Sequence, residues 1–354
     1  MKRGFFFAII VSVLCISINV SATGANNPAR LFLVASYDCD NVCGAPQETG
    51  ALNELRDNDW IEGENLIVGR FYMQTKSRYT SPDEIHQRGL AALEKIRQFN
   101  PDIVLTFDDN AFREVGLALA GGPVPVVFSG LNGQPEDYNR IRRFMTSRQH
   151  PEGNITGVYE KLYLEHSLEV LAAAFPELRG GKVVGITDDS PTGKALSKQF
   201  RIELGQTRQI AGLQWEERRV KTFGEYQKLI RQLNENPEVV AIYPVAVRLP
   251  TADGTIRTAR QIFPWTIAHS TKPELALNYY FSKLGLFGGA AVDFRKMGAV
   301  AGRQVGWILE GRHAGDLAIV DAPDYAIVFN LTRAEELGLQ IPMPLLTAAD
   351  HIYR

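Results

Sequence analysis

Short apolar runs alternate with longer amphipathic segments along most of the chain. In the first half this pattern predicts four strands separated by three helices. The predicted strands are 31–36, 65–72, 102–107 and 124–129, and the predicted helices are 47–57, 81–99 and 111–120. The second helix opens with Ser81-Pro82-Asp83-Glu84, a good helix-capping sequence. Apolar strands joined by crossover helices are typical of a parallel sheet, so this half predicts a doubly wound α/β unit.

The alternation stops over residues 130–153, which are polar and charged and contain Pro135 and Pro151. This composition predicts a loop that leads out of the first unit. The alternation then resumes and predicts a second unit of the same kind. Its predicted strands are 155–159, 182–187, 214–220, 239–245 and 273–278, and its predicted helices are 162–175, 192–206, 223–234 and 254–266.

The last segment, 283–354, is too small for a third domain. It predicts a helix at 295–309, a strand at 326–331 and a short helix at 334–337. We expect it to return to the first unit and then to cross back, so that several crossings join two lobes. The expected first lobe is 23–130 with about 283–315, and the expected second lobe is 131–282 with about 316–354.

The first residues predict a secretory signal peptide at 1–22. Lys2 and Arg3 precede an uncharged apolar run from Gly4 to Ile18, and Val20-Ser21-Ala22 places small residues where a signal peptidase cleaves. The run is shorter than the roughly 20 residues of a membrane span. A lipid anchor at Cys15 is disfavoured by the large Leu14 before it. We therefore expect a periplasmic protein cleaved near Ala22.

Composition narrows the classes of function. The 38 basic and 40 acidic residues give a formal net charge of −2, which offers no reason to expect nucleic acid. Cleavage would leave Cys39 and Cys43 in an oxidising compartment, where a small disulfide loop is expected. A metal pair is the alternative, but no histidine lies near them and zinc needs about four ligands. We expect neither a metal nor a cofactor.

Several segments, in order and at similar spacing, resemble one family. They are Pro101–Leu105 before Asp108-Asp109-Asn110-Ala111, Val124–Asn132, Gly153–Val158, Val292-Asp293-Phe294 with Gly298 and Gly302, Ile308–Gly311, Asn330–Ala334 and Leu337–Pro342. Together they are similar to the ABC transporter substrate-binding proteins of the type I periplasmic-binding-protein superfamily. The resemblance implies an α/β fold of two doubly wound parallel-sheet lobes joined by a hinge that the chain crosses several times. It also implies a monomer.

Loops that follow strands are the candidates for a ligand site, because ligands of open parallel sheets bind outside the carboxyl ends of the strands. In the first lobe the candidates are Ser36, Tyr37, Asp38, Asp108, Asp109, Asn110, Ser129, Gly130 and Asn132. In the second lobe and on the returning segments they are Tyr159 with Glu160, Asp188, Asp189, Ser190, Pro244, Asn278 and Asp293.

These residue types suit an amino-acid-like ligand. The acidic pairs can meet an ammonium group, and hydroxyls at Ser36, Ser129 and Ser190 can hold a carboxylate. The alternative for Asp109 and Asp189 is that they only cap the following helices. Tyr37 and Tyr159 can stack on an apolar part of the ligand.

The expected function is that of a binding protein whose lobes close on a small molecule and deliver it to an ABC permease. The same fold can instead report its ligand to a membrane sensor kinase, and the sequence does not separate the two. An enzyme is the third class. The sequence contains no nucleophile elbow, phosphate loop or histidine pair at metal spacing, and its six histidines are scattered. We therefore expect no catalytic residues.

Overall fold

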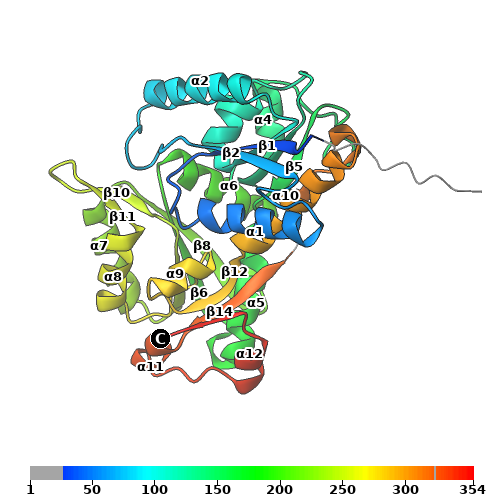
Figure 1. The fold of residues 1–354 in the computed structure, drawn as a ribbon. Coiled ribbons are helices and arrows are strands. Elements are labelled where there is room, and N and C mark those ends of the chain that lie inside the picture. Colours follow the sequence, from blue (N-terminus) through cyan, green and yellow to red (C-terminus); the bar gives the residue numbers. More distant parts are fainter. Residues whose placement is uncertain (1–26, 323) are drawn as a thin grey trace, which may run out of the picture.

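The computed structural model describes residues 27–322 and 324–354, so the predicted signal peptide lies outside the described residues. The described chain forms two α/β lobes, the first built on one six-stranded sheet and the second on a four-stranded and a three-stranded sheet (Figure 1). No helix of the described part is long and apolar enough to cross a membrane. The two-lobed α/β architecture expected from the sequence is confirmed.

The first lobe is built on a six-stranded sheet in the order β13-β5-β4-β3-β1-β2, in which every neighbouring pair is parallel. Its strands are β1 (Ala29–Ala35), β2 (Leu66–Tyr72), β3 (Ile103–Phe107), β4 (Val126–Leu131), β5 (Ile155–Tyr159) and β13 (Val320–Asp321). Its helices are α1 (Gly44–Asp57), α2 (Pro82–Phe99), α3 (Asp108–Ala111), α4 (Pro135–Ile141) and α10 (Phe294–Leu309), with a π-helical turn η1 (Phe112–Gly116) and a 3-10 turn η3 (Ala314–Asp316).

Both faces of this sheet are buried, as expected for a parallel sheet. Leu31 of β1 packs in one apolar cluster with Ala51 of α1 and Val305 of α10. Phe32, the next residue, packs in a second cluster with Ile96 of α2. The alternation of side chains along β1 therefore divides the helices between the two faces.

Helices α1 and α10 lie side by side beneath this sheet and approach closely because glycines line their contact (Figure 1). A Cβ atom added at Gly298 would lie 2.1 Å from the carbonyl oxygen of Gln47, and one at Gly302 would lie 2.4 Å from that of Ala51. These distances are far inside van der Waals contact. The two glycines that carry part of the family resemblance therefore fix the position of α1, which also bears a site residue described below.

The second lobe contains a four-stranded sheet, β7-β8-β6-β9, and a three-stranded sheet, β12-β14-β15. Single bridges at Glu274, Leu275 and Asn278 connect them. The strands are β6 (Lys182–Asp188), β7 (Gln209–Ile210), β8 (Leu213–Val220), β9 (Val239–Pro244), β12 (Gly288–Val292), β14 (Tyr325–Asn330) and β15 (His351–Tyr353), with a separate hairpin of β10 (Arg248–Pro250) and β11 (Ile256–Thr258). The helices are α5 (Leu164–Ala174), α6 (Pro191–Leu204), α7 (Phe223–Glu235), α8 (Ala259–His269), α9 (Tyr279–Lys283), α11 (Leu331–Glu336) and α12 (Met343–Ala348), with a 3-10 turn η2 (Pro176–Leu178).

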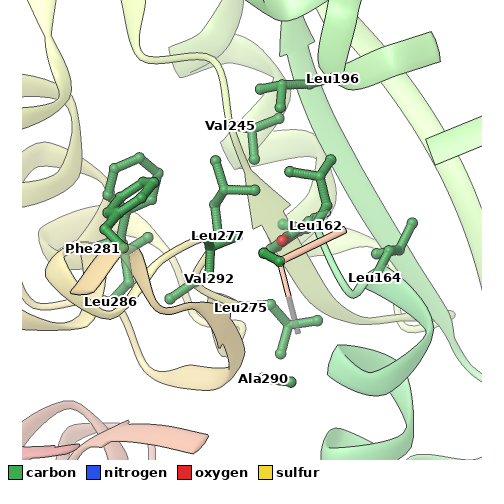
Figure 2. Close-up of a cluster of buried hydrophobic side chains, with 14 of the residues drawn as sticks. Leu162, Leu164, Leu196, Val245, Leu275, Leu277, Phe281, Leu286, Ala290 and Val292 are labelled. Carbon is green, nitrogen blue, oxygen red and sulfur yellow. The ribbon is translucent and has the colours of Figure 1, made fainter. Parts of the chain in front are cut away.

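The core of the second lobe gathers side chains from distant parts of the chain. Figure 2 shows Leu162 and Leu164, where the chain enters α5, in the same cluster as Leu275, Ala290 and Val292 of the returning segments. Each of these five residues is fully buried. The apolar cluster that contains them also contains residues of α1 and α10, so the apolar core is continuous from one lobe to the other.

Sheet pairing corrects the expected lobe boundaries. The segment 155–159 was expected in the second lobe, but β5 pairs with β4 of the first sheet. The segment after 283 was expected in the first lobe, but β12 pairs with β14 of the second lobe. The polar stretch 130–153 misled the prediction because it is an internal loop with its own helix α4 rather than a linker. The chain crosses after β5, after β12 and after β13.

Two predicted elements also differ. The expected strand at 273–278 forms only single bridges, and the expected helix at 254–266 begins at Ala259 after a hairpin strand. The pairs β12–β14 and β7–β8 are antiparallel, so the second lobe is not wholly parallel as expected. The capping sequence at 81–84 is confirmed, because Ser81 accepts from the Glu84 amide and the Glu84 carboxylate accepts from the Ser81 amide.

Candidate functional site

Asp108 lies where β3 ends and α3 begins. It is 2 % exposed and adopts a left-handed φ of 65°. The Gln47 side-chain amide donates to its Oδ1 at 3.2 Å, whereas its buried Oδ2 has no partner among the described residues. Burial raises the pKa of Asp108 to about 7, although the positive charge of Lys76 opposes that rise. The Asp108 carboxyl group is therefore buried with one of its two oxygens lacking a hydrogen-bond partner among the described residues.

Gln47 sets the position of that carboxyl group. It projects from α1, is fully buried, and accepts a hydrogen bond from the Ser129 hydroxyl at 2.7 Å. Gly130 has φ +79°, and a Cβ atom there would lie 2.7 Å from the Gln47 amide. Ser129 and Gly130 were both predicted as ligand contacts. In the structure Ser129 bonds to Gln47, and Gly130 packs against the Gln47 side chain.

Glu160 follows β5 where the chain first crosses between lobes. It is 3 % exposed, and its carboxylate has no hydrogen-bond or ion-pair partner in the part of the chain that the structure describes. Burial raises its pKa well above the usual value, Asp108 and Asp109 add to the rise, and Lys76 opposes it. Gln199 of α6 donates to the Glu160 backbone carbonyl at 2.8 Å, which joins this crossing to the second lobe.

Tyr37 and Lys76 complete the group. Tyr37 follows β1 and is 5 % exposed, and the Lys76 ammonium lies 3.6 Å from the centre of its ring. Burial, followed by Asp108 and Asp109, raises the pKa of Tyr37 well above its usual value. We call Tyr37, Lys76, Asp108 and Glu160 the acid site.

The remaining first-lobe candidates bind other parts of the protein. Ser36 donates to the Phe107 carbonyl and accepts from the Ala111 amide, both at 2.8 Å. Asp109 accepts from the backbone amides of Asn132 and Gly133 and from Tyr138, so it fastens the loop after β4 instead of capping a helix. The other contacts are Asp38 with Gln74 and Ser77, Asn110 with Thr75, and Asn132 with Asp109.

Tyr159 connects the two lobes. Its hydroxyl accepts from Gln134 of the first lobe and from Gln199 of α6 in the second. A second link joins Lys198 of α6 to Asp137 of α4. The ring of Tyr159 is 4 % exposed, so it packs between the lobes and is not open for stacking.

The second-lobe candidates are mostly helix caps. Asp188 is 2 % exposed, its Oδ1 accepts from the Ser190 amide at 2.9 Å, and its buried Oδ2 has no partner among the described residues. Ser190, rather than Asp189, caps α6. Asp189 lies beside Arg219. Asn278 and Asp293 cap α9 and α10, and Pro244 is buried at the end of β9. Within the described chain, no hydrogen bond or ion pair joins these residues to the acid site.

The predicted disulfide is wrong, because Cys39 and Cys43 are both free. Cys39 is exposed. Cys43 precedes α1 and faces inward, where burial raises the pKa of its thiol to about 12 against the effect of Lys76.

Two surface hollows lie elsewhere. One of about 340 Å³ is lined by residues of α11 and the following loop, and one of about 420 Å³ lies beside Lys182 and Glu238, where β6 and β9 begin. Neither hollow includes the acid site, where Asp108 and Glu160 are 2 % and 3 % exposed.

Residues 78–353 match the model of a family described as ABC transporter substrate binding protein. The chain belongs to this family. The matched range of this substrate-binding protein includes Asp108 and Glu160 and leaves out Tyr37 and Lys76. A search of curated proteins found no match.

Solved structures similar to this substrate-binding protein share its fold at low sequence identity. One is an ABC domain in complex with L-Trp from Streptococcus pneumoniae, with TM-score 0.69, 17% identity, 92% of this chain and 100% of that chain. Another is a conserved domain protein from Vibrio cholerae, with TM-score 0.69, 18% identity and the same coverage. A third is the ligand-free, open form of an adhesive substrate-binding protein from Clostridium difficile, with TM-score 0.69, 14% identity, 92% of this chain and 99% of that chain.

The sequence pointed to part of the acid site. Asp108, Tyr37 and Glu160 all follow strands, and the rule that ligands bind at strand ends found them. Lys76 follows β2 and would have been found by applying the same rule to that strand. Gln47 lies inside a helix, and only the packing of α1 against α10 brings it under Asp108.

Proposed function

We propose that this protein is an extracytoplasmic binding protein that captures a small amino-acid-like molecule between its lobes and delivers it to an ABC permease. The observation that carries the proposal is the acid site. Asp108 and Glu160 are both buried, Asp108 Oδ2 has no hydrogen-bond partner among the described residues, and buried carboxylates are costly unless they are paired. A ligand ammonium group would supply the missing partner. The L-Trp bound by the Streptococcus protein belongs to this chemical class.

The proposal includes a hinge motion. Because the acids are buried, ligand entry requires an open form, and contacts from both lobes favour closure once the ligand is bound. Tyr159 and the Lys198–Asp137 pair join the lobes directly and would separate on opening. We propose Asp188, whose Oδ2 is also buried without a partner, as a contact from the second lobe.

A thermal-shift screen of the purified protein against amino acids, amines, sugars and organic acids tests this function. A ligand present at one hundred times its dissociation constant should add about 2.7 kcal/mol of stability. Asp108→Ala and Asp188→Ala should each weaken the binding of that ligand without unfolding the protein. Stabilisation by sugars alone, or wild-type affinity in both variants, would contradict the proposed ligand class and site.

A further inference from the structure

An amino acid carries a carboxylate as well as an ammonium group, and the residues expected to hold the carboxylate are occupied. Ser36 is bonded to Phe107 and Ala111, and Ser129 donates to Gln47. Ser190 donates to Asp188 and accepts from the Gly193 amide. None of the three hydroxyls retains a proton to offer a ligand. A carboxylate at this site must therefore find another donor.

Lys76 is placed to be that donor. It lies in the loop between β2 and α2, its side chain is exposed, and no carboxylate of the described residues lies within 4.0 Å of its ammonium group. The ammonium rests instead on the face of Tyr37, at 3.6 Å from the ring centre. The preceding residue, Thr75, donates to the Ser36 carbonyl at 2.7 Å and accepts from the Asn110 side chain at 2.9 Å, so Lys76 adjoins the loops that carry Tyr37 and Asp108.

Asp108 Oδ2, on a residue 2 % exposed, has no hydrogen-bond partner among the described residues and can accept from a ligand ammonium group. The long, flexible lysine side chain can turn from Tyr37 toward a carboxylate that enters with that cation. The acid site thus combines two buried acids, which can bind an ammonium group, with an exposed lysine, which can bind a carboxylate.

We propose that Lys76 holds the carboxylate of a zwitterionic ligand whose ammonium group lies against Asp108 and Glu160, and that Lys76 thereby selects amino acids over the corresponding amines. This inference rests on the proposed function. A charge-assisted hydrogen bond to the carboxylate corresponds to roughly 10- to 100-fold in affinity. A plain amine gains nothing from Lys76 and is repelled by its charge. The exposed position of Lys76 means that its replacement should leave folding intact.

Matched ligand pairs measured by titration calorimetry test the proposal: L-tryptophan with tryptamine, L-tyrosine with tyramine, and L-lysine with cadaverine. The wild type should bind at least one amino acid at least tenfold more tightly than its amine. Lys76→Met should weaken that amino acid by about 10- to 100-fold and leave the amine unchanged or tighter. Lys76→Arg should keep the wild-type preference, because arginine also donates to carboxylates.

Lys283→Met is the matched control. Lys283 is also exposed with its ammonium over a tyrosine ring, 6.0 Å from the centre of Tyr280, but it lies on α9 and should not affect affinity. Three results would overturn the role of Lys76 while leaving ligand capture intact. Lys76→Met could weaken the amino acid and its amine equally, or weaken neither. The wild type could also bind the amine as tightly as the amino acid. A wild type that binds no member of any pair would overturn it as well. The broad thermal-shift screen then decides whether ligand capture itself also fails.

Discussion

Each lobe buries charged side chains, but the two lobes treat them differently. In the second lobe Glu274 is fully buried and Arg333 is 5 % exposed, and the guanidinium donates to both carboxylate oxygens at 3.0 and 2.6 Å. Arg333 also donates to the Ser270 carbonyl at 2.8 Å. In the acid site, two equally buried carboxyl groups have one amide donor between them. A charge whose partners come from the protein belongs to the scaffold, whereas a charge without them marks where a ligand is expected.

Breaking the paired site should have the largest effect. Arg333→Met would leave Glu274 buried without its cation, which costs about 3–5 kcal/mol of unfolding free energy. Urea denaturation of the two proteins measures the loss. A double variant, Arg333→Met with Glu274→Leu, should recover much of it because no isolated charge remains. A loss below about 1 kcal/mol in the single variant would show that the pair is not part of the scaffold.

The acid site should make stability depend on pH through Asp108. The pKa of Asp108 is raised to about 7 in the folded protein, so the folded state binds its proton more tightly than the unfolded state. Without ligand, stability should therefore fall as the pH rises from about 4 to about 7 and change no further from this group above that range.

The variant Asp108→Asn, which keeps the bond from Gln47, should remove that part of the pH dependence. It should be more stable than the wild type at pH 8 by on the order of 2 kcal/mol. The groups that act on Asp108 are Gln47, Lys76 and Asp109, with Tyr37, Cys43 and Glu160 coupled to it. Unfolding curves at pH 4, 6 and 8 give the comparison. Parallel pH profiles for the two proteins would mean that Asp108 is not held unsatisfied.

Ligand affinity should depend on the second carboxyl group as well. Glu160→Gln keeps the shape of the side chain and removes its charge, so binding of an ammonium ligand should weaken about 10- to 100-fold. Asp57→Asn, at an exposed carboxylate on α1, is the matched control and should bind normally. Calorimetry at pH 8 measures both. Undiminished affinity in Glu160→Gln would remove Glu160 from the site.

The smallest effect should come from the exposed link between the lobes. Lys198 and Asp137 are 44% and 37% exposed, so water screens their attraction. Lys198→Met should change stability by less than about 1 kcal/mol and affinity by less than about fivefold. Calorimetry on the variant checks this. A larger loss of affinity would make this pair, and not the acid site, the main determinant of closure.

The alternation of apolar runs and amphipathic segments was enough to predict the architecture. Strands such as β5 and β6 are apolar over most of their length, and the Ser81 cap marks the start of α2. The lobe boundaries were not predictable in this way. Whether residues 155–159 pair with β4 or with another strand depends on tertiary contacts, because local sequence predicts a strand but not its neighbour.

The sequence located candidate site residues at strand ends but could not predict which of them are already bonded within the protein. Asp108 follows β3 and Ser129 lies near the end of β4, yet Asp108 is left without a full set of partners and Ser129 is bonded to Gln47. Only the position of α1 against α10 distinguishes them. The cysteine pair failed for a similar reason, since the start of α1 turns Cys43 inward and leaves Cys39 outside.

A crystal structure with the ligand identified by the thermal-shift screen tests the central claim most directly. It should place a ligand nitrogen within hydrogen-bonding distance of Asp108 Oδ2, with the Glu160 carboxylate on the same nitrogen. A ligand bound elsewhere, with both carboxyl groups still buried and unpartnered, would contradict the account.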